Sequence, residues 1–476
     1  STEERFHRQT KRFGDANQSQ VLQYWGEISE DERIKLLDQL ETLPVTSLEH
    51  LNEIYKHSIE EKKGTENINP FPNTEIAVLK SVDKENAKKW HDYGLSLIAQ
   101  SKVGVLLLAG GQGTRLGSTL PKGMYDLKLG SKKTLFQLQA ERILKLVKLA
   151  QEKVPGSNPV IHWYIMTSDF TGEVSSEFFK KHNFFGLDES TVHFFSQESL
   201  PCMSYPDGKI ILESKSSVAL APNGNGGVYT SLKNTKMLQH MKDHGVEHIH
   251  SYCVDNILVK VADPTFIAYC IERNADVGSK VVAKRDAHEP VGVFAIKDGD
   301  YNVVEYSEIT KQMAETIDPE TNRLAFNAGN IANFYYKTEF LEYCADKMEK
   351  QEDYHIAKKK IPTVGNTSVD GIKLELFNFD VVPLTKKVAL LEVARETDFS
   401  PLKNSPEAKS DNPQTCRQHL SEINKMYLEQ AGAVVEGEVD EKNGLYCEIS
   451  PLVSYEGEGL EALVKGKTIK LPYILE

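Results

Sequence analysis

The sequence predicts an α/β fold, because short apolar strands alternate with helices from residue 103 onward. Strands are expected at residues 103–108, 163–167, 192–195 and 248–254, and helices at residues 134–151 and 234–244. This alternation is typical of a sheet whose strands are joined by crossover helices. The segment 103–108 is apolar at almost every position, which indicates a strand that is buried on both faces, as in a parallel sheet.

The segments on either side of this region have a different pattern. The first hundred residues are polar with apolar residues at helical spacing, and helices are expected at residues 18–30, 31–42, 47–62 and 83–100. From about residue 386 a strand at 388–393 and a helix at 418–430 precede short strands separated by glycine turns. We therefore expect a mainly helical domain at 1–100, an α/β domain at 101–385 and a small α+β domain at 386–476.

Composition limits the setting in which the protein works. The chain has 476 residues, of which 40% are hydrophobic and 26% charged, and its net charge of −13 argues against nonspecific binding to nucleic acid or to acidic membranes. We find no apolar run long enough to span a membrane and no signal-peptide segment. Six scattered cysteines without a CxxC pair fit a reducing compartment and argue against structural zinc. We expect a cytoplasmic protein without nucleic-acid or membrane partners, a monomer in preference to a dimer.

A glycine-rich loop follows the strand at 103–108. Its glycines are Gly110, Gly111, Gly113 and Gly117. They permit positive φ angles and remove Cβ atoms, so that backbone N–H groups can surround an oxyanion. Arg115 adds a planar set of donors and Lys122 adds a mobile charge, and both suit phosphate oxygens. The segment therefore predicts a phosphate-binding loop.

Three better-known phosphate loops do not fit this spacing. The dinucleotide fingerprint needs G-x-G-x-x-G and an acidic residue about twenty positions later, whereas the spacing here is Gly111-x-Gly113-x-x-x-Gly117. A Walker A loop needs G-x-x-x-x-G-K-S/T, a protein kinase needs H-R-D and D-F-G, and the sequence contains none of these motifs. A nicotinamide oxidoreductase is thus a poor alternative, and the pattern that remains is A-G-G-x-G-T-R-L-G followed by P-K-G.

Several later segments carry polar groups that could contact a ligand. Asp255 follows the strand at 248–254, where a carboxylate could bind Mg²⁺, although a helix N-cap explains it equally well. Gly224 and Asn225 belong to PNGNGG, which suits a backbone close to a base or sugar, or a surface turn. Lys373 lies among strand-forming apolar residues, where a lysine is costly unless it reaches solvent or an anion. By itself, Lys403 fits a surface lysine better.

The motifs in their order resemble one family. LAGGQGTRLG, PKG, WYIMTS, GNGG, YCVDN, RDAHEPVGV, EYSEI, AGNIANFYY, YHIAKKKIP, GIKLE and FSPLKN occur in this order over roughly residues 100–410. Together they resemble the eukaryotic UDP-N-acetylglucosamine pyrophosphorylases, of the UDPGP type 1 nucleotidyltransferase family, and point to a fungal member. The resemblance implies a central Rossmann-like, GT-A-like mixed sheet flanked by N- and C-terminal domains. It also implies synthesis of UDP-N-acetylglucosamine and pyrophosphate from UTP and N-acetylglucosamine 1-phosphate.

The same resemblance assigns roles to individual residues. Those expected around UTP are Leu108, Ala109, Gly110, Gly111, Gln197, Gly224 and Asp255, with Asp255 also the expected ligand of a Mg²⁺ cofactor. Those expected at its phosphates, and as catalytic residues, are Arg115, Lys122 and Lys373. Those expected at the amino sugar and its phosphate are Asn225, Gly292, Glu305, Tyr306, Asn330 and Lys403.

The chain departs from the family pattern at three places, and alternatives within the class stay open. Asn223 replaces an aspartate, Ser168-Asp169-Phe170 replaces a Gly-Pro continuation, and Glu198-Ser199 replaces Gly-Thr. A UDP-glucose or broad-specificity UDP-sugar pyrophosphorylase would use similar residues. A non-catalytic nucleotide-sugar binding protein should lack Arg115 or Lys122, and both are present.

Overall fold

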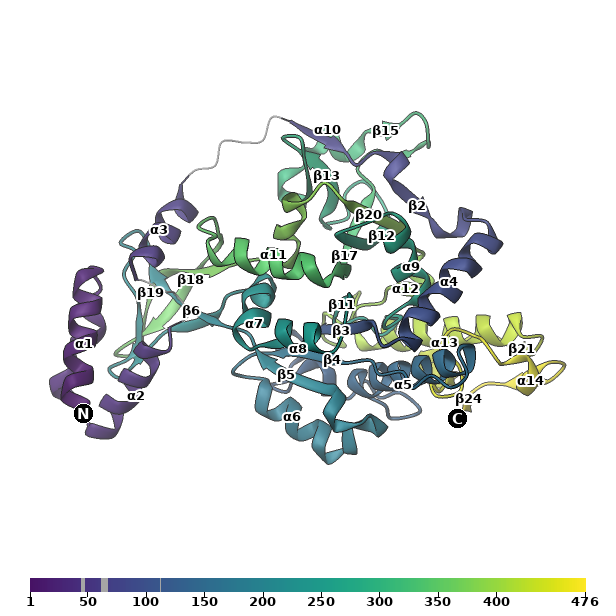
Figure 1. The fold of residues 1–476 in the computed structure, drawn as a ribbon, viewed down its shortest axis with the longest axis horizontal. Helices are drawn as coiled ribbons and strands as arrows, with labels where there is room; N and C mark the ends of the chain where they lie inside the picture. The colour runs from purple at the N-terminus through teal and green to yellow at the C-terminus, as the bar shows by residue number, and fades with distance from the viewer. Residues whose placement is uncertain (44–47, 61–66, 112) are drawn as a thin grey trace. The chain divides into compact units, whose positions relative to one another are not determined.

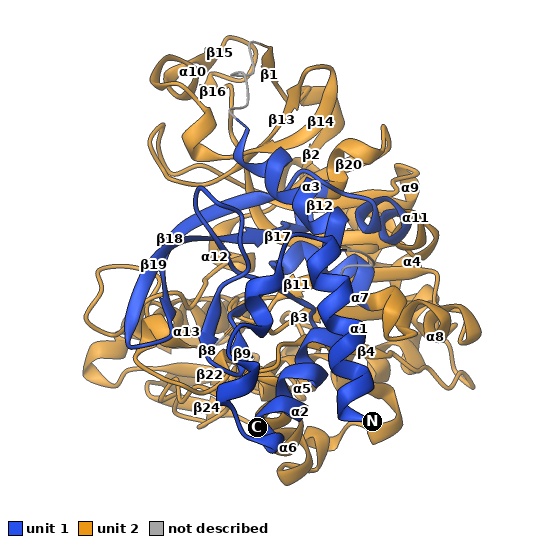
Figure 2. Cartoon of the chain, turned by 90° about the vertical axis from the view of Figure 1, so that its left-hand side faces the viewer, with its two compact units in different colours: residues 1–64, 197–231, 344–380 blue, residues 65–196, 232–343, 381–476 orange. Residues whose placement is uncertain are grey.

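The computed structural model describes residues 1–43, 48–60, 67–111 and 113–476 (Figure 1). Contacts divide the chain into two compact units, which Figure 2 colours separately. Unit 1 comprises Ser1–Gly64, Gln197–Ser231 and Cys344–Asp380, and unit 2 comprises Thr65–Ser196, Leu232–Tyr343 and Val381–Glu476. These two units do not test the three domains that we expect from the sequence, and those domains stay a prediction. Part of the expected helix at 47–62, and Gln112 of the glycine loop, lie outside the described residues.

A mixed sheet forms the centre of unit 2. Along its main path the strands are β2 (Ile76–Val78), β20 (Val388–Glu392), β12 (Val277–Ala283), β17 (Ala328–Lys337), β11 (His248–Cys253), β3 (Val103–Leu108), β4 (Trp163–Thr167) and β5 (Val192–Ser196). The strands β1 (Ile68–Pro70), β13 (Val293–Lys297) and β14 (Asp300–Val304) extend it beside β17. Strands β11, β3, β4 and β5 are parallel, whereas β17 is antiparallel to both β11 and β12. The predicted α/β class and mixed sheet are confirmed.

Helices of unit 2 share a hydrophobic core with this sheet. They include α4 (Lys84–Ala99), α5 (Leu135–Lys153), α6 (Gly172–Lys181) and α9 (Pro264–Glu272) (Figure 1). All six residues of β3 are buried, as their apolar sequence predicts. Helix α4 approaches α9 so closely that a Cβ atom on Gly94 would lie 2.2 Å from the carbonyl oxygen of Pro264. Helix α4 therefore packs directly against α9 in unit 2.

Unit 2 contains further helices and two small strand pairs. They include α8 (Met237–Asp243), α12 (Arg395–Asp398), α13 (Pro413–Gln430), and the strand pairs β21 (Val434–Glu436) with β23 (Thr468–Lys470) and β22 (Cys447–Ile449) with β24 (Tyr473–Leu475). The C-terminal strands have a small hydrophobic cluster of their own. In the part of the chain that the structure describes, no helix combines the length and apolar character that crossing a bilayer requires.

Unit 1 combines helices with small sheets. Its elements include α1 (Thr2–Asp15), α2 (Glu30–Glu41), α3 (Leu48–Ile59), the pair β6 (Ser199–Pro201) with β10 (Leu220–Pro222), and the sheet β18 (His355–Thr363), β19 (Thr367–Glu375) and β7 (Met203–Ser204). The helix expected at 18–30 is wrong, because two separate 3₁₀ turns, Ser19–Leu22 and Trp25–Glu27, occupy this segment. Neither turn has a capping side-chain hydrogen bond, and the second contains Gly26, a residue that disfavours helix.

Candidate active site

The glycine loop begins at the carboxyl edge of the parallel strands. Leu108, the last residue of β3, is paired with Cys253, the last residue of β11. The next residue, Ala109, donates its N–H to the carbonyl of Met166 on β4 over 2.8 Å. The hydroxyl of Ser168 then donates to the carbonyl of Gly110 over 3.0 Å. Ser168 belongs to a segment that departs from the family pattern, and here it fixes the start of the loop.

The loop closes on itself and leaves Arg115 exposed. Gly113 donates its N–H to the carbonyl of Leu120 over 3.1 Å, and its own carbonyl accepts from Ser118 N–H over 3.0 Å. Gly117 ends the single 3₁₀ turn that carries Arg115, with a φ of +77° that favours glycine.

Lys122 is held by a close contact between the loop and α5. It begins the 3₁₀ turn Lys122–Met124, directly after Pro121. A Cβ atom on Gly123 would lie 2.3 Å from the ring of Phe136, so only glycine lets the turn pack against this buried ring. The glycine of the P-K-G motif therefore serves to position the lysine.

Four predicted site residues of unit 2 line one cavity. Its volume is about 350 Å³, and it is lined by Gly113, Thr114, Arg115, Leu116, Lys122, Asp255 and Lys403. Arg115 and Lys403 are exposed, whereas Lys122 and Asp255 are half-buried. Three cations around one carboxylate make a basic pocket in a chain whose net charge is −13. Thr114 and Leu116 were not singled out from the sequence, and their only signal was membership of the loop motif.

Backbone hydrogen bonds connect Asp255 with the segment that carries Lys403. The carbonyl of Asp255 accepts from Leu402 N–H over 2.8 Å, and the side chain of Asn256 accepts from Ser400 N–H over 2.9 Å and donates to the carbonyl of Asp398 over 2.7 Å. The N-cap interpretation of Asp255 is wrong, because residues 256–262 form turns and no helix. Lys403, which looked like a surface lysine, is brought to the pocket by these contacts.

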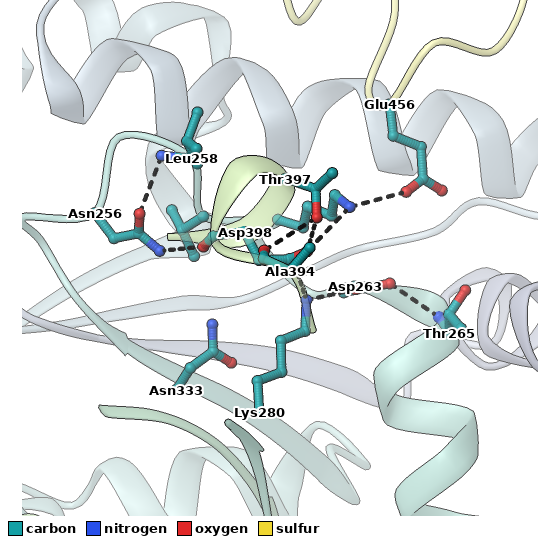
Figure 3. Close-up of polar contacts among 12 residues, drawn as sticks. Asn256, Leu258, Asp263, Thr265, Lys280, Asn333, Ala394, Thr397, Asp398 and Glu456 are labelled. Atoms are coloured by element: carbon teal, nitrogen blue, oxygen red, sulfur yellow. Dashed lines mark hydrogen bonds and ion pairs between the residues drawn. The ribbon is translucent and has the colours of Figure 1, made fainter. Parts of the chain in front are cut away.

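A buried ionic network lies beside this connection (Figure 3). Lys280 on β12 lies 2.6 Å from a carboxylate oxygen of Asp263 and 2.8 Å from one of Asp398 on α12. Lys260 lies 3.5 Å from the second oxygen of Asp398. Burial alone would raise the pKa of Asp398, but Lys260 and Lys280 outweigh it and hold this pKa well below its ordinary value. The network fastens the segment before Lys403 to the central sheet.

Four of the residues expected at the amino sugar, Gly292, Glu305, Tyr306 and Asn330, lie where β13, β14 and β17 join. Because Val293 pairs with Val304, Gly292 and Glu305 lie opposite each other just beyond the paired segment. Gly292 accepts a hydrogen bond from Asn330 N–H over 2.8 Å, and Tyr306 is exposed.

This second group lies at the same edge of the sheet as the phosphate pocket. Tyr252 of β11 pairs with Asn333 of β17 in antiparallel register. Asp255 lies three residues after Tyr252, and Asn330 lies three residues before Asn333, so both follow the same end of the ladder. The sequence-predicted phosphate and sugar residues of unit 2 therefore share one edge.

The other four predicted residues belong to unit 1, where Gln197 contacts the loop that carries Gly224 and Asn225. Gln197 donates a side-chain hydrogen bond to the carbonyl of Gly224, and the side chain of Asn225 accepts from Asn378 N–H over 2.8 Å. Gly224 has a φ of +84°, and a Cβ atom there would lie 2.2 Å from the carbonyl oxygen of Leu376. The GNGG segment is therefore a tightly fitted loop and not a free surface turn.

Lys373 lies on the strand that leads to this contact. It belongs to β19 and is half-buried between the buried residues Ile372 and Leu374. Its charge opposes the rise that burial causes in the pKa of Cys202. The roles expected for these four residues stay predictions.

The fold and the pocket define a class of protein. A glycine loop, an arginine and two lysines at the carboxyl edge of parallel strands in a mixed α/β sheet are features of a protein that binds the phosphates of a nucleotide. The family described as UTP–glucose-1-phosphate uridylyltransferase (UDPGP) matches residues 48–436. The chain belongs to this family, as its motifs suggested.

Individual relatives match almost the whole chain. "UDP-N-acetylhexosamine pyrophosphorylase-like protein 1" of Xenopus tropicalis is 42% identical, over 98% of this chain and 96% of the relative. "UDP-N-acetylglucosamine pyrophosphorylase" of Saccharomyces cerevisiae is 40% identical, over 96% of each. A crystal structure of the uridine diphosphate N-acetylglucosamine pyrophosphorylase of Trypanosoma brucei has a TM-score of 0.85 at 32% identity, and covers 95% of this chain and 93% of that one.

Proposed function

We propose that the protein is a uridylyltransferase that makes UDP-N-acetylglucosamine and pyrophosphate from UTP and N-acetylglucosamine 1-phosphate. The observation that carries this proposal is the pocket in which Arg115, Lys122 and Lys403 surround Asp255. The names of the Saccharomyces and Trypanosoma relatives support the identity of the sugar nucleotide.

The proposed reaction is an in-line displacement at the α-phosphorus of UTP. A phosphate oxygen of the sugar phosphate forms the new P–O bond, while the bond from the α-phosphorus to the bridging oxygen of the β-phosphate breaks and pyrophosphate leaves with the electron pair. The attacking phosphate is already ionised near neutral pH, so that no general base is required. Catalysis then consists of positioning and of neutralising charge.

The cations of the pocket divide this work between them. Arg115, with its planar donors, would bind the pyrophosphate group as it leaves. Lys122 would reduce the repulsion between the α-phosphate and the incoming anion, and Lys403 would hold the phosphate of the sugar.

The pocket also suits a magnesium ion. Mg²⁺ in nucleotide sites is commonly bound by one or two carboxylates together with phosphate oxygens and water, and Asp255 is a half-buried carboxylate in a pocket suited to phosphate. We therefore propose Asp255 as the protein ligand of Mg²⁺. When bound, Mg²⁺ would offset part of the negative charge of the triphosphate.

Pyrophosphate release tests the proposal directly. The purified chain is incubated with UTP and, in separate reactions, with the 1-phosphates of N-acetylglucosamine, N-acetylgalactosamine and glucose, with and without Mg²⁺. We expect the highest kcat/KM with N-acetylglucosamine 1-phosphate and Mg²⁺. A preference for glucose 1-phosphate would replace the proposal by a UDP-glucose pyrophosphorylase, and nucleotide binding without any release would indicate a non-catalytic binding protein.

A substitution of Asp255 tests the metal assignment in the same assay. Asp255→Asn removes the charge but keeps the size of the side chain, and we expect the Mg²⁺ concentration that gives half-maximal activity to rise by at least about tenfold. Asp243→Asn, which changes an exposed carboxylate of unit 2, is the control. An unchanged Mg²⁺ dependence in Asp255→Asn would contradict the assignment.

A further inference from the structure

Four histidines gather at the amino-terminal edge of the parallel strands. His162 directly precedes β4, and His193 on β5 lies opposite Tyr164 of β4. His240 lies on α8, and His244 is the C-cap of the same helix. The phosphate pocket follows the carboxyl ends of β3 and β11, which run parallel to β4 and β5, so the histidines lie at the opposite edge of the sheet.

The ring nitrogens of three of these histidines converge. One nitrogen from each of His162, His193 and His240 lies within 4.8 Å of the other two, and Nδ1 of His162 is 3.0 Å from Nε2 of His193. In a tetrahedral zinc site with Zn–N bonds of about 2.0 Å, ligand nitrogens are about 3.3 Å apart. One pair is therefore already at this spacing, and the widest separation would have to close by roughly 1.5 Å.

The protonation state of the cluster suits metal binding. Burial, followed by repulsion from the neighbouring histidines, lowers the pKa of His162 and of His193 to about 4. Burial also lowers the pKa of His240, although Asp243 on the same helix acts in the opposite direction. At neutral pH these rings are therefore uncharged, which is the form in which imidazole binds a metal ion.

Neighbouring groups orient the two rings on α8. The hydroxyl of Tyr164 lies 2.8 Å from Nδ1 of His240, which leaves Nε2 of that ring to face a ligand. His244 donates from Nδ1 to the carbonyl of His240 over 2.8 Å, because a carbonyl can only accept, and in the neutral form of this ring Nε2 is the nitrogen with the lone pair. The rings of His240 and His244 stack with centroids 3.9 Å apart, so His244 borders the cluster. It is not one of the three residues whose nitrogens converge within 4.8 Å, and its ring would have to turn to supply a fourth nitrogen.

We propose that His162, His193 and His240 form a binding site for a divalent transition-metal ion of the zinc class, with His244 as the fourth ligand. A set of neutral imidazoles suits Zn²⁺, Ni²⁺ or Cu²⁺, whereas Mg²⁺ and Ca²⁺ require oxygen ligands. The site therefore differs in chemistry from the carboxylate at Asp255. A bound ion would cross-link β4, β5 and α8. The cysteine spacing that argues against structural zinc does not bear on this site, because it contains no cysteine.

Metal titration tests this proposal without reference to activity. The full chain, in buffer with excess Mg²⁺ to occupy oxygen-ligand sites, is titrated with Zn²⁺ against a chromophoric chelator. We expect one tight equivalent for the wild type and binding at least about 100-fold weaker in His193→Gln and His240→Gln. Tyr164→Phe should keep one equivalent with about 10- to 100-fold weaker binding, because it removes only the group that orients His240.

Controls separate this site from accidental binding. His182→Gln changes an exposed histidine of unit 2 and should leave the titration unchanged. Substitution by Co²⁺ should give the visible bands of a tetrahedral nitrogen site without a thiolate charge-transfer band, and circular dichroism shows that each variant is folded. Equal Zn²⁺ affinity in wild type and His193→Gln, or a thiolate band with Co²⁺, would overturn the proposal and leave a hydrogen-bonded cluster of rings.

Discussion

Arg115 contributes little to the stability of the fold, whereas the proposed reaction depends on it. It is exposed on a single turn of 3₁₀ helix and lines the pocket that contains Asp255. An exposed side chain on a short turn contributes little to a hydrophobic core, so its replacement should leave the protein folded. Its effect on the rate can therefore be separated from any effect on stability.

We predict that Arg115→Ala lowers kcat by about 10²- to 10³-fold, which is the usual cost of removing one group that stabilises developing charge. Arg115→Lys keeps the charge but loses the planar pair of donors, and should recover part of the rate. The measurement is steady-state pyrophosphate release, with thermal unfolding as the control for folding. A near-normal kcat in Arg115→Ala would show that this residue does not have the role that we assign to it.

At the scale of elements, β12 and α12 meet through charges that are almost completely buried. The exposed fractions of the Lys280, Asp263 and Asp398 side chains are 1%, 6% and 2%. A buried ion pair is not in itself strong evidence for stability, but removing one partner leaves the other charge in a poor environment. Because α12 leads into the segment that carries Lys403, a substitution that disrupts this network should also disturb the position of Lys403 in the pocket.

Lys280→Met should therefore reduce the free energy of unfolding by about 3 to 5 kcal/mol, since it removes the cation that pairs with both Asp263 and Asp398 and leaves Lys260 at 3.5 Å from Asp398. We also expect a higher KM for the sugar phosphate, because Lys403 is positioned through α12. Urea unfolding and steady-state kinetics measure the two effects. Lys386→Met, which removes the exposed ion pair with Asp300, is the matched control and should change neither quantity appreciably. A Lys280→Met protein as stable as the control would contradict the argument.

The sequence predicted which segments form strands and loops better than it predicted which segments lie next to one another in space. The apolar run of β3 and the glycine loop were recognisable because burial on both faces and phosphate binding each impose a local pattern. The strand at 388–393 was also expected, but its position between β2 and β12 was not, because an apolar run does not identify its partners. The Lys280 network was missed for the same reason, since Lys280 and Asp398 are 118 residues apart in the sequence.

The candidate site shows the same limit. Arg115 and Lys122 could be found from their spacing in one motif, and the structure brings both to the pocket. Lys403 could not be found from local sequence, since it lies in an ordinary turn, and its segment is brought to the pocket by hydrogen bonds from Ser400 and Leu402 to Asn256 and Asp255. Resemblance to the family supplied this residue, and elementary reasoning from its neighbours favoured a surface position.

For the whole molecule, buried histidines make stability depend on pH. Burial lowers the pKa of His250 to about 4, and that of His248 likewise, against an ordinary value near 6.5. His250 is fully buried, where its Nδ1 accepts from Ala262 N–H and its Nε2 lies 2.8 Å from the Asn333 side-chain oxygen. Unfolding exposes these rings and raises their pKa values, so that the unfolded chain binds more protons below pH 6.5.

We therefore predict that the free energy of unfolding falls as the pH decreases from about 6.5 to 4, with about 3 kcal/mol from His250 alone. Above pH 6.5 this contribution is fully present, because the ring is uncharged in both states. Urea unfolding at half-unit pH intervals measures the slope, and His250→Gln should reduce it by about 1.4 kcal/mol per pH unit. The exposed His182→Gln should leave the slope unchanged, and an equal effect of the two variants would contradict the assignment.

The position of β20 has a consequence for how the chain can be made and shortened. Residues 388–392 fill the gap between β2, near residue 77, and β12, near residue 280. During synthesis both of these strands leave the ribosome long before the strand that joins them. Any product that stops before residue 388 would therefore present two open strand edges, which are templates for pairing between chains. Premature termination in this region should yield aggregates and not a smaller working enzyme.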